Sequence, residues 1–452
     1  MKPLLSVESL RDLTEPLRQA NEEFVQRYPG ETGRRQPVHT VYGGAHLFKS
    51  DTAQRLGSLA LRSVEQFAPD FVSFAHALEL PSSEQLSRTI YERVNEKLRR
   101  EPVEDFRIDF EDGYGNRPDS EEDEHTRAAA IEVAKGINNG TLPPFIGIRI
   151  KPFNEELRAR SFRTLDIFVS TLAKQTKANL PDNFVVTLPK ITIPQQVSTL
   201  AALLERLEKQ NELPPRSLKF EMMIETTQSI INHRGEINLP RLLAVSDGRC
   251  VAAHFGTYDY TAGCNITAAH QHMLHPACDF AKNMMQVSFA GTGIWLSDGA
   301  TNIMPVAPHR PSQGGPPLSA EQIEENRQVV YRAWKLHYDH VKHSLVTGFY
   351  QGWDLHPAQL PTRYAAVYSF FLESLEAASE RLKNFVEKAA KATLVGDVFD
   401  DAATGQGLLN YFLRAINCGA ISEDEALTRS GLTLEELRSA SFVKILKNRQ
   451  SL

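Results

Sequence analysis

The sequence predicts an α/β fold: a (β/α)8 barrel followed by a C-terminal helical extension. Short apolar segments rich in β-branched and aromatic residues recur along the chain, and helical patterns separate most of them. The chain has 452 residues, 41% of them hydrophobic, which suffices for one barrel with insertions and a large core. We expect the barrel over residues 1–360 and the helical extension over residues 361–452.

Nine segments have the pattern of strands, one more than a closed eight-stranded barrel needs. They span residues 39–44, 70–75, 106–112, 145–152, 184–190, 219–225, 250–256, 293–298 and 347–353. We expect segment 70–75 to be the surplus one, either an accessory strand or the edge of a buried helix.

Helices are predicted between these segments and after the last of them. Apolar residues repeat on one helical face at Val197, Leu200, Leu203, Leu204 and Leu207. Capping boxes open further helices at Ser319 with Gln322, Ser422 with Glu425 and Thr433 with Glu436. After His356 the pattern is helical to the end of the chain.

Residues 305–318 (PVAPHRPSQGGPPL) are too rich in Pro and Gly for a helix or strand to persist. The segment follows a predicted strand, so it would lie on the upper face of the barrel. A plain linker is the favoured interpretation, and a lid over that face is the alternative.

The composition argues against several classes of protein. A formal net charge of −6 provides no basic surface for nucleic acid, and no apolar run reaches the roughly 18 residues of a membrane span. Residues 1–18 lack the basic-then-apolar order of a signal peptide. The four cysteines form no metal-type pair and are too sparse for a disulfide scaffold, so a cytoplasmic location is expected.

Charged residues occur at the ends of several predicted strands, where a barrel carries its chemistry. In FRIDFED (106–112), Arg107, Asp109 and Glu111 share one face because side chains alternate along a strand. Two carboxylates and a cation are costly inside a barrel unless they are paired or bound to a metal. An internal salt-bridge network is the alternative to a metal site.

Three further charged residues point to a metal and an anion. Arg149 lies within the apolar strand FIGIRIKP and requires an anionic partner, either Asp109, Glu111 or a substrate carboxylate. Glu225 ends one predicted strand, and Asp259 follows the next one by three residues. Two carboxylates from neighbouring strands, with the other positions left to water and substrate, suit Mg²⁺. The sequence therefore predicts a divalent metal site at this end of the barrel.

These segments resemble, in order, the citrate lyase β-subunit-like (HpcH/HpaI aldolase) family, a group of aldolases and lyases within the phosphoenolpyruvate/pyruvate barrel superfamily. The matching motifs are FRIDFEDGYG, IGIRIKP, VTLPKI, MMIETTQSI, HFGTYDYT and GFYQGWDLHPAQL. The resemblance runs over residues 39–360, which is most of the chain.

The resemblance implies a Mg²⁺-dependent or Mn²⁺-dependent carbon–carbon lyase or aldolase that acts on a 2-oxo acid or an acyl-CoA through an enolate. It implies that Glu225 and Asp259 bind the metal. Arg149 would bind the oxo-acid oxygen and stabilise the enolate. The supporting residues that it implies are Asp109, Glu111 and Asp112 for organising metal-bound water, Gly256 and Thr257 for contacting the substrate, and Asp298 as the general base. A homo-oligomer is expected.

The sequence departs from the family's pattern at the first strand, HTVYGGAHLF, which lacks the family's arginine unless His39 or Lys49 replaces it. Gly43 and Gly44 either make a sterically required turn, which is the favoured interpretation, or present backbone amides to an anion. Lys190 either pairs with a carboxylate or forms a Schiff base, of which the first is favoured.

Clustered histidines offer a second candidate metal site. The segment AAHQHMLH brings His270, His272 and His275 close together. An ordinary loop or substrate contacts are favoured over a metal, because His270 and His272 are only two residues apart. His356 is expected to close the barrel rather than to react.

Two other functions stay open at this point. A Claisen-type synthase resembling malate synthase would share the metal and the arginine but run a condensation. A non-catalytic barrel subunit would keep the motifs for packing alone and would bind no metal.

Overall fold

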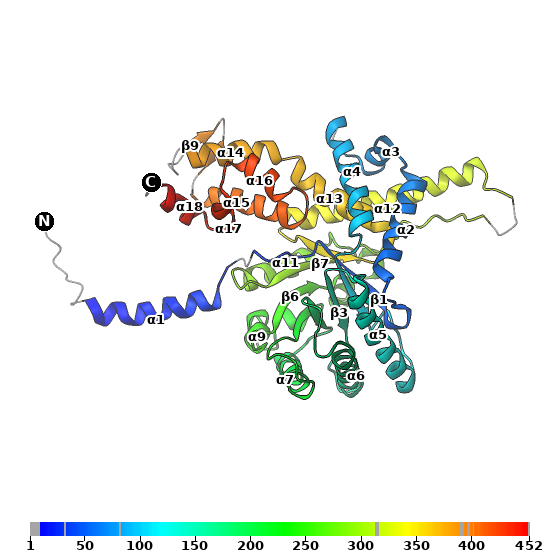
Figure 1. The fold of residues 1–452 in the computed structure, drawn as a ribbon, viewed down its shortest axis with the longest axis horizontal. Helices are drawn as coiled ribbons and strands as arrows, with labels where there is room; N and C mark the ends of the chain where they lie inside the picture. The colour runs from blue at the N-terminus through cyan, green and yellow to red at the C-terminus, as the bar shows by residue number, and fades with distance from the viewer. Residues whose placement is uncertain are drawn as a thin grey trace.

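A closed barrel of eight parallel strands, arranged in sequence order, forms the centre of the protein (Figure 1). The computed structural model describes residues 10–30, 33–80, 83–311, 316–387, 393–395, 398–400 and 402–450. The barrel strands are β1 (His39–Gly44), β2 (Asp105–Asp109), β3 (Phe145–Arg149), β4 (Phe184–Leu188), β5 (Lys219–Ile224), β6 (Cys250–Phe255), β7 (Trp295–Ala300) and β8 (Gln351–Asp354). The predicted (β/α)8 fold is confirmed.

The register of the strands sets the level of the residues that end them. Gly44 of β1 pairs with Asp109 of β2, and Asp109 pairs with Arg149 of β3. Because all eight strands are parallel, their carboxyl ends meet at one end of the barrel. The loops that follow the strands therefore share a single mouth.

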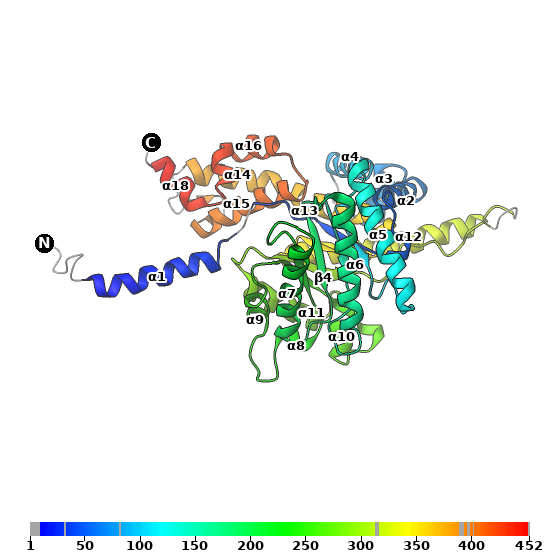
Figure 2. The same cartoon turned by 60° about the horizontal axis from the view of Figure 1, so that its bottom comes forward.

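Helices surround the barrel, as Figures 1 and 2 show from two directions. After β1 come η2 (Ala45–Leu47), α2 (Thr52–Phe67), α3 (Phe71–Leu78) and α4 (Glu84–Arg100), and after β2 to β4 come α5 (Asp119–Asn139), α6 (Arg158–Thr176) and α7 (Pro194–Gln210). The rest are α8 (Thr227–Ile230), α9 (Leu239–Ala244), α10 (Thr257–Gly263), η3 (Ala268–His270), α11 (Pro276–Phe289), α12 (Ala320–Val346), η4 (Pro357–Gln359) and α13 (Leu360–Leu372). The predicted apolar face of α7 is buried at Val197, Leu200, Leu204 and Leu207.

The surplus ninth segment is a helix. Asp70 caps α3, because its side chain accepts a hydrogen bond from the Ser73 backbone amide at 2.8 Å. Phe74 and Leu78 on its inner face are fully buried. The accessory-strand interpretation of residues 70–75 is wrong, and the buried-helix alternative is confirmed.

The Pro- and Gly-rich segment precedes α12 in the chain and runs alongside it. The His309 amide donates to the Asn326 side chain at 2.8 Å, and that side chain donates back to the His309 carbonyl at 2.9 Å. The described part of the segment contains no helix or strand, and it projects from the barrel together with the first turns of α12 (Figures 1 and 2). This course favours the linker interpretation. The predicted capping box of Ser319 and Gln322 opens α12.

The last part of the chain forms a separate group of helices beside the barrel (Figures 1 and 2). It contains α14 (Leu375–Glu387), α15 (Ala402–Asn417), α16 (Glu423–Ser430), α17 (Leu434–Arg438) and α18 (Phe442–Gln450). The predicted capping boxes open α16 and α17. Two short antiparallel strands, β9 (Thr393–Val395) and β10 (Val398–Asp400), interrupt it, so the expectation of helices to the end is wrong there.

This group lies at the end of the barrel opposite the mouth. Asn417 of α15 accepts from the Gln36 amide at 2.8 Å, and Gln36 stands just before β1. Helix α13 instead packs against α12 and α4. The division into 1–360 and 361–452 stays a prediction.

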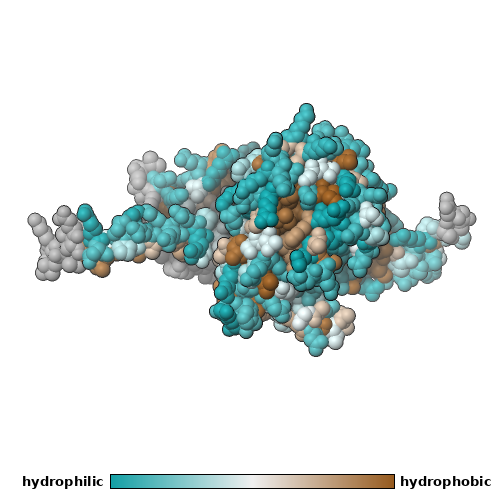
Figure 3. Space-filling view, turned by 90° about the horizontal axis from the view of Figure 1, so that it is seen from below, coloured by the Kyte–Doolittle hydropathy of each residue, from teal (hydrophilic) through white to brown (hydrophobic). Residues whose placement is uncertain are grey.

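Helix α1 (Arg11–Arg27) has no buried residue and projects from the rest of the chain (Figure 1). The face seen in Figure 3 is mostly hydrophilic, with scattered hydrophobic residues. Across the described ranges, no helix has both the length and the apolar composition of a membrane span.

Candidate active site

The carboxyl ends of β2 to β6 bring the predicted functional residues to the mouth of the barrel. Asp109 ends β2 and Arg149 ends β3. Glu225 directly follows β5, and Asp259 lies in the first turn of α10 after β6. The residues that the sequence places in one site are thus carried on neighbouring strands.

Arg149 is held rigidly by Asp109. The Arg149 Nε and Nη2 atoms donate to the two carboxylate oxygens of Asp109 at 2.7 and 2.5 Å. Burial alone would raise the pKa of Asp109, but the charge and hydrogen bonds of Arg149 and two backbone amides lower it. Arg149 Nη1 lies 3.1 Å from Glu111 Oε2. Asp109 therefore orients the guanidinium, and Nη1 is the part directed toward the mouth.

Arg107 belongs to a different, deeper network. Its Nε donates to Glu221 Oε1 at 2.9 Å, and its Nη1 pairs with Asp105. All three side chains are buried. The salt-bridge alternative therefore holds for Arg107, one layer below the residues that face the mouth.

Lys190, two residues after β4, links the acidic groups. Its Nζ donates to Glu111 Oε1 at 2.6 Å and to Asp112 at 3.2 Å, and it lies 3.6 Å from Asp259 Oδ2. Its backbone amide donates to Glu225 Oε1 at 2.7 Å, from a left-handed conformation with φ of 50°. The nearby carboxylates outweigh burial and raise the pKa of Lys190. Lys190 therefore pairs with carboxylates, as favoured from the sequence.

Glu225 lies buried among carboxylates whose negative charge its other neighbours do not fully neutralise. It is 3% exposed, and burial, then Asp259 and then Glu111, raise its pKa to about 8. Burial likewise raises the pKa of Glu111, whose Oε2 atom is enclosed and accepts no hydrogen bond. A cation beside Glu225 and Asp259 would remove this repulsion.

The donor set fits a hard divalent ion that keeps water ligands. Within the described ranges, no three His, Cys, Asp or Glu side chains are arranged as metal ligands. Mg²⁺ is commonly bound by one or two carboxylates, with water and substrate completing the shell. Glu225 and Asp259 provide such a pair, so the residues present suit Mg²⁺ or Mn²⁺ better than a structural zinc site.

Gly256 is required by the approach of Glu225. A Cβ at this position would lie 2.5 Å from the Glu225 Cβ. We expect Gly256→Ala to displace Glu225 and to weaken Mn²⁺ binding by about tenfold or more. The measurement is titration with Mn²⁺ followed by electron paramagnetic resonance.

Gly263→Ala is the matched control for that variant, since a Cβ at Gly263 in α10 meets nothing within 4 Å. We expect unchanged Mn²⁺ affinity and equal or slightly higher stability. Equal affinity in both alanine variants would contradict the role given to Gly256.

Thr257 and Asp298 differ in their relation to the mouth. Thr257 opens α10 directly after β6, and its hydroxyl is enclosed without a hydrogen-bond partner. Asp298 Oδ2 accepts from Lys282 of α11 at 3.0 Å and from Ser344 of α12 at 2.6 Å. Asp298 is thus turned into the helix layer, and the structure does not bring it to Arg149 and Glu225.

Other predicted positions have structural roles. A Cβ on Gly44 would clash with the Gly113 carbonyl and the His46 ring, so the sterically required turn is confirmed there. His275 Nδ1 accepts from the Ala277 amide at 3.1 Å and caps α11. His356 caps η4 in the same way after β8, as expected for a residue that closes the barrel.

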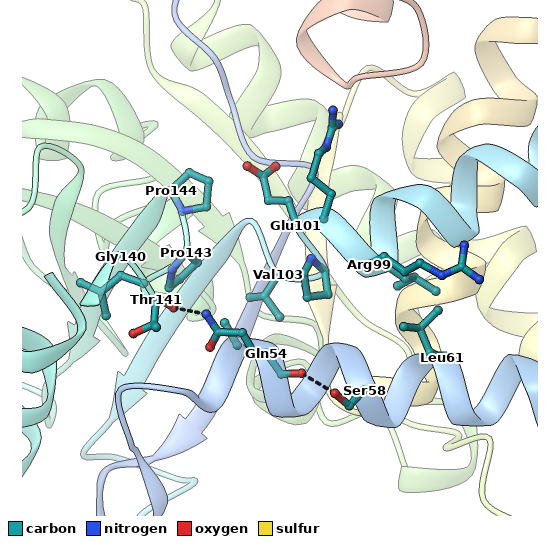
Figure 4. A pocket seen from close by; sticks show the side chains of 15 residues that line it. Gln54, Ser58, Leu61, Arg99, Glu101, Val103, Gly140, Thr141, Pro143 and Pro144 are labelled. Carbon is teal, nitrogen blue, oxygen red and sulfur yellow. Dashed lines mark hydrogen bonds between the residues drawn. The ribbon is translucent and has the colours of Figure 1, made fainter. Parts of the chain in front are cut away.

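A cavity of about 470 Å³ lies away from this site (Figure 4). Its lining comes from α2, the end of α4 and the loops before β2 and β3, and Gln54 donates to the Thr141 carbonyl there at 2.9 Å. These loops precede their strands, so the cavity lies at the opposite end of the barrel from Arg149.

Comparison with known families agrees with this architecture. The family described as a domain of unknown function, DUF6986, matches residues 17–445. The chain belongs to the DUF6986 family. No curated protein matches this DUF6986 chain.

Solved structures resemble the DUF6986 chain at low sequence identity. A citrate lyase from Burkholderia xenovorans is 16% identical over 87% of this chain and 95% of its own, with a TM-score of 0.57. CitE from Mycobacterium tuberculosis, in complex with magnesium, acetoacetate and coenzyme A, is 13% identical over 86% and 99%, with a TM-score of 0.47. Haloferax volcanii malate synthase is 14% identical over 82% and 95%, with a TM-score of 0.42. The predicted resemblance to citrate lyase-like barrels is confirmed for the fold.

Proposed function

We propose that this DUF6986 protein is a divalent-metal-dependent carbon–carbon lyase or aldolase that acts on a 2-oxo acid or an acyl thioester. One observation carries the proposal: Lys190 contacts both acids at the mouth, with its amide 2.7 Å from Glu225 Oε1 and its Nζ 3.6 Å from Asp259 Oδ2, beside the fixed guanidinium of Arg149. The fold similarity to a protein named citrate lyase supports the same class of reaction. A cytoplasmic location and a homo-oligomer stay predictions.

Glu225 and Asp259 would hold Mg²⁺ or Mn²⁺, which supplies a Lewis acid and a template for the oxo acid's carboxylate and carbonyl oxygens. Arg149 provides permanent positive charge where the enolate oxygen gathers electrons as the carbon–carbon bond breaks. Lys190 keeps Glu111 and Asp112 in place beside Arg149.

We propose Glu111 as the proton acceptor in place of Asp298. Its Oε2 atom lies 3.1 Å from Arg149 Nη1 and accepts no hydrogen bond, and burial raises its pKa, which makes it a stronger base than an ordinary carboxylate. Asp298 is already engaged by Lys282 and Ser344. In cleavage, the proton moves from the hydroxyl to Glu111 while the bonding electrons move to the enolate.

The test is hydrogen exchange at the methyl group of pyruvate. With Mg²⁺ in D₂O, the protein should catalyse loss of the methyl proton signal, because enolate formation is common to both directions of the reaction. Glu225→Gln should show no exchange above the solution rate. If wild-type protein binds no metal and shows no exchange, the non-catalytic alternative is supported. Release of free thiol from acetyl-CoA with glyoxylate would instead indicate the Claisen-type synthase.

The raised pKa of Glu225 predicts a pH dependence. The carboxyl must lose its proton to bind a metal, so Mn²⁺ affinity should rise about tenfold per pH unit up to the pKa of about 8 and then level off. In the metal-free protein, stability should fall as pH rises from the ordinary value of 4.5 to about 8, because only the folded state retains the proton.

Isothermal titration with Mn²⁺ at several pH values, and urea unfolding of the metal-free protein, measure both effects. Glu225→Gln should remove the pH dependence of stability in this range. A flat affinity profile would contradict the placement of Glu225.

A further inference from the structure

Two aromatic side chains pack against the Arg149 guanidinium. Tyr42 is on β1 and Trp353 on the adjacent strand β8, where Thr40 pairs with Trp353. Their ring centroids are 4.2 Å apart. The centre of the Arg149 guanidinium lies 4.8 Å from the Tyr42 centroid and 5.3 Å from that of Trp353. Cation–π contacts of this kind bind the guanidinium to both rings.

The polar side-chain atoms of this aromatic pair are shielded from solvent. Both residues are partly exposed, although they lie on strands inside a closed barrel. The Tyr42 hydroxyl and the Trp353 Nε1 atom are nevertheless enclosed and have no hydrogen-bond partner. The accessible part of each ring therefore presents an apolar wall next to Arg149.

The charges around this wall disfavour a second anion. Arg149 is already paired with Asp109 and Glu111, and Lys190 with Glu111 and Asp112. The faces of aromatic rings carry negative electrostatic potential. A substrate fragment that packs on the wall would bind more tightly through apolar contact, and a carboxylate on that fragment would weaken its binding.

We propose that the carbonyl partner in the carbon–carbon bond is an uncharged, apolar aldehyde that packs against Tyr42 and Trp353. The inference rests on the proposed function and names its second substrate. In the synthetic direction, C3 of pyruvate loses a proton and forms a bond to the aldehyde carbon. The aldehyde oxygen gains a proton, and the product is a 4-hydroxy-2-oxo acid, with no oxidant or reductant required.

The experiment compares acceptors at fixed pyruvate and Mg²⁺. Product formation is measured with hexanal and benzaldehyde as apolar acceptors and with glyoxylate and succinic semialdehyde as anionic ones. For wild-type protein we expect kcat/KM to favour an apolar acceptor by about tenfold or more. Pyruvate methyl exchange is recorded in the same samples, without acceptor.

Variants of the two tryptophans test whether Trp353 determines the preference for apolar acceptors. Trp353→Leu should reduce the ratio of apolar to anionic kcat/KM by about tenfold, and Trp353→Phe should retain most of it because a ring remains. Trp295→Leu is the matched control. Trp295 begins β7 at the opposite end of the barrel, so the ratio should not change. The ratio of apolar to anionic kcat/KM does not change when a variant loses activity equally with every acceptor, so it reports acceptor preference alone.

The outcomes separate this inference from the proposed function. Methyl exchange together with a preference for glyoxylate or succinic semialdehyde would overturn the inference and leave the proposed function standing. An unchanged ratio in folded Trp353→Leu would also overturn it. The wild-type ratio decides the matter even if that variant fails to fold. Absence of exchange would overturn both.

Discussion

Asp259→Ala is expected to weaken Mn²⁺ binding by at least about 100-fold and to abolish pyruvate exchange. The side chain is 43% exposed, so its removal should leave the fold intact. The same variant should lower the pKa of Glu225 below about 8, since Asp259 is the main charge that raises it. Mn²⁺ titration and carboxyl-carbon NMR of the metal-free protein measure the two effects independently.

Asp182→Ala is the control for Asp259→Ala. Asp182 is exposed and lies in the loop before β4, at the other end of the barrel. It should change neither metal affinity nor the pKa of Glu225. If Asp259→Ala kept full Mn²⁺ affinity, or left the Glu225 pKa unchanged, the two carboxylates would not share a site and the proposed function would fail.

Arg149→Lys is expected to lower the rate of exchange by about 100-fold or more. A lysine ammonium retains the charge but cannot donate to both oxygens of Asp109 in the geometry that the guanidinium uses. It would also lose the flat contact with Tyr42 and Trp353. The measurement is the exchange rate at saturating Mg²⁺, with unfolding in urea recorded alongside.

Arg107→Lys separates loss of chemistry from loss of stability. Arg107 is equally buried, pairs with Asp105 and Glu221, and lies in the layer below the mouth. Both variants should reduce the free energy of unfolding by about 1–3 kcal/mol. Only Arg149→Lys should lower the exchange rate per folded molecule. Equal rates in the two variants would contradict the role of Arg149.

Much of the fold could be predicted because it depends on local patterns. The eight barrel strands and helices such as α7 appear in the sequence as apolar runs and helical periodicity. Segment 70–75 could not be assigned from its pattern, since a short apolar run suits a strand and a buried helix equally well. Its capping by Asp70 and its packing decide for the helix. The short pair β9 and β10 is formed by contacts between neighbours, which the helical pattern around it conceals.

The site was partly predictable, because strand ends are identifiable from the sequence. Arg149 and Asp109 lie on adjacent strands at the same level, and their pairing follows from alternation and register. The sequence predicts Lys190 as a carboxylate partner but not as the link between several acids, since these acids follow two different strands, β2 and β6. Asp298 was assigned to the site by its position at a strand end, but the direction of its side chain depends on the helices behind β7.

The sequence by itself determined that this chain forms a (β/α)8 barrel and which charged residues end its strands. The spacing of apolar residues is sufficient for this assignment, because side chains repeat every two residues on one face of a strand and every three to four on one face of a helix. Only the tertiary structure decided which of those residues meet. The contacts of Lys190 with Glu225, Asp259 and Glu111, and the aromatic wall next to Arg149, depend on strand register and barrel closure, which bring together residues far apart in the chain.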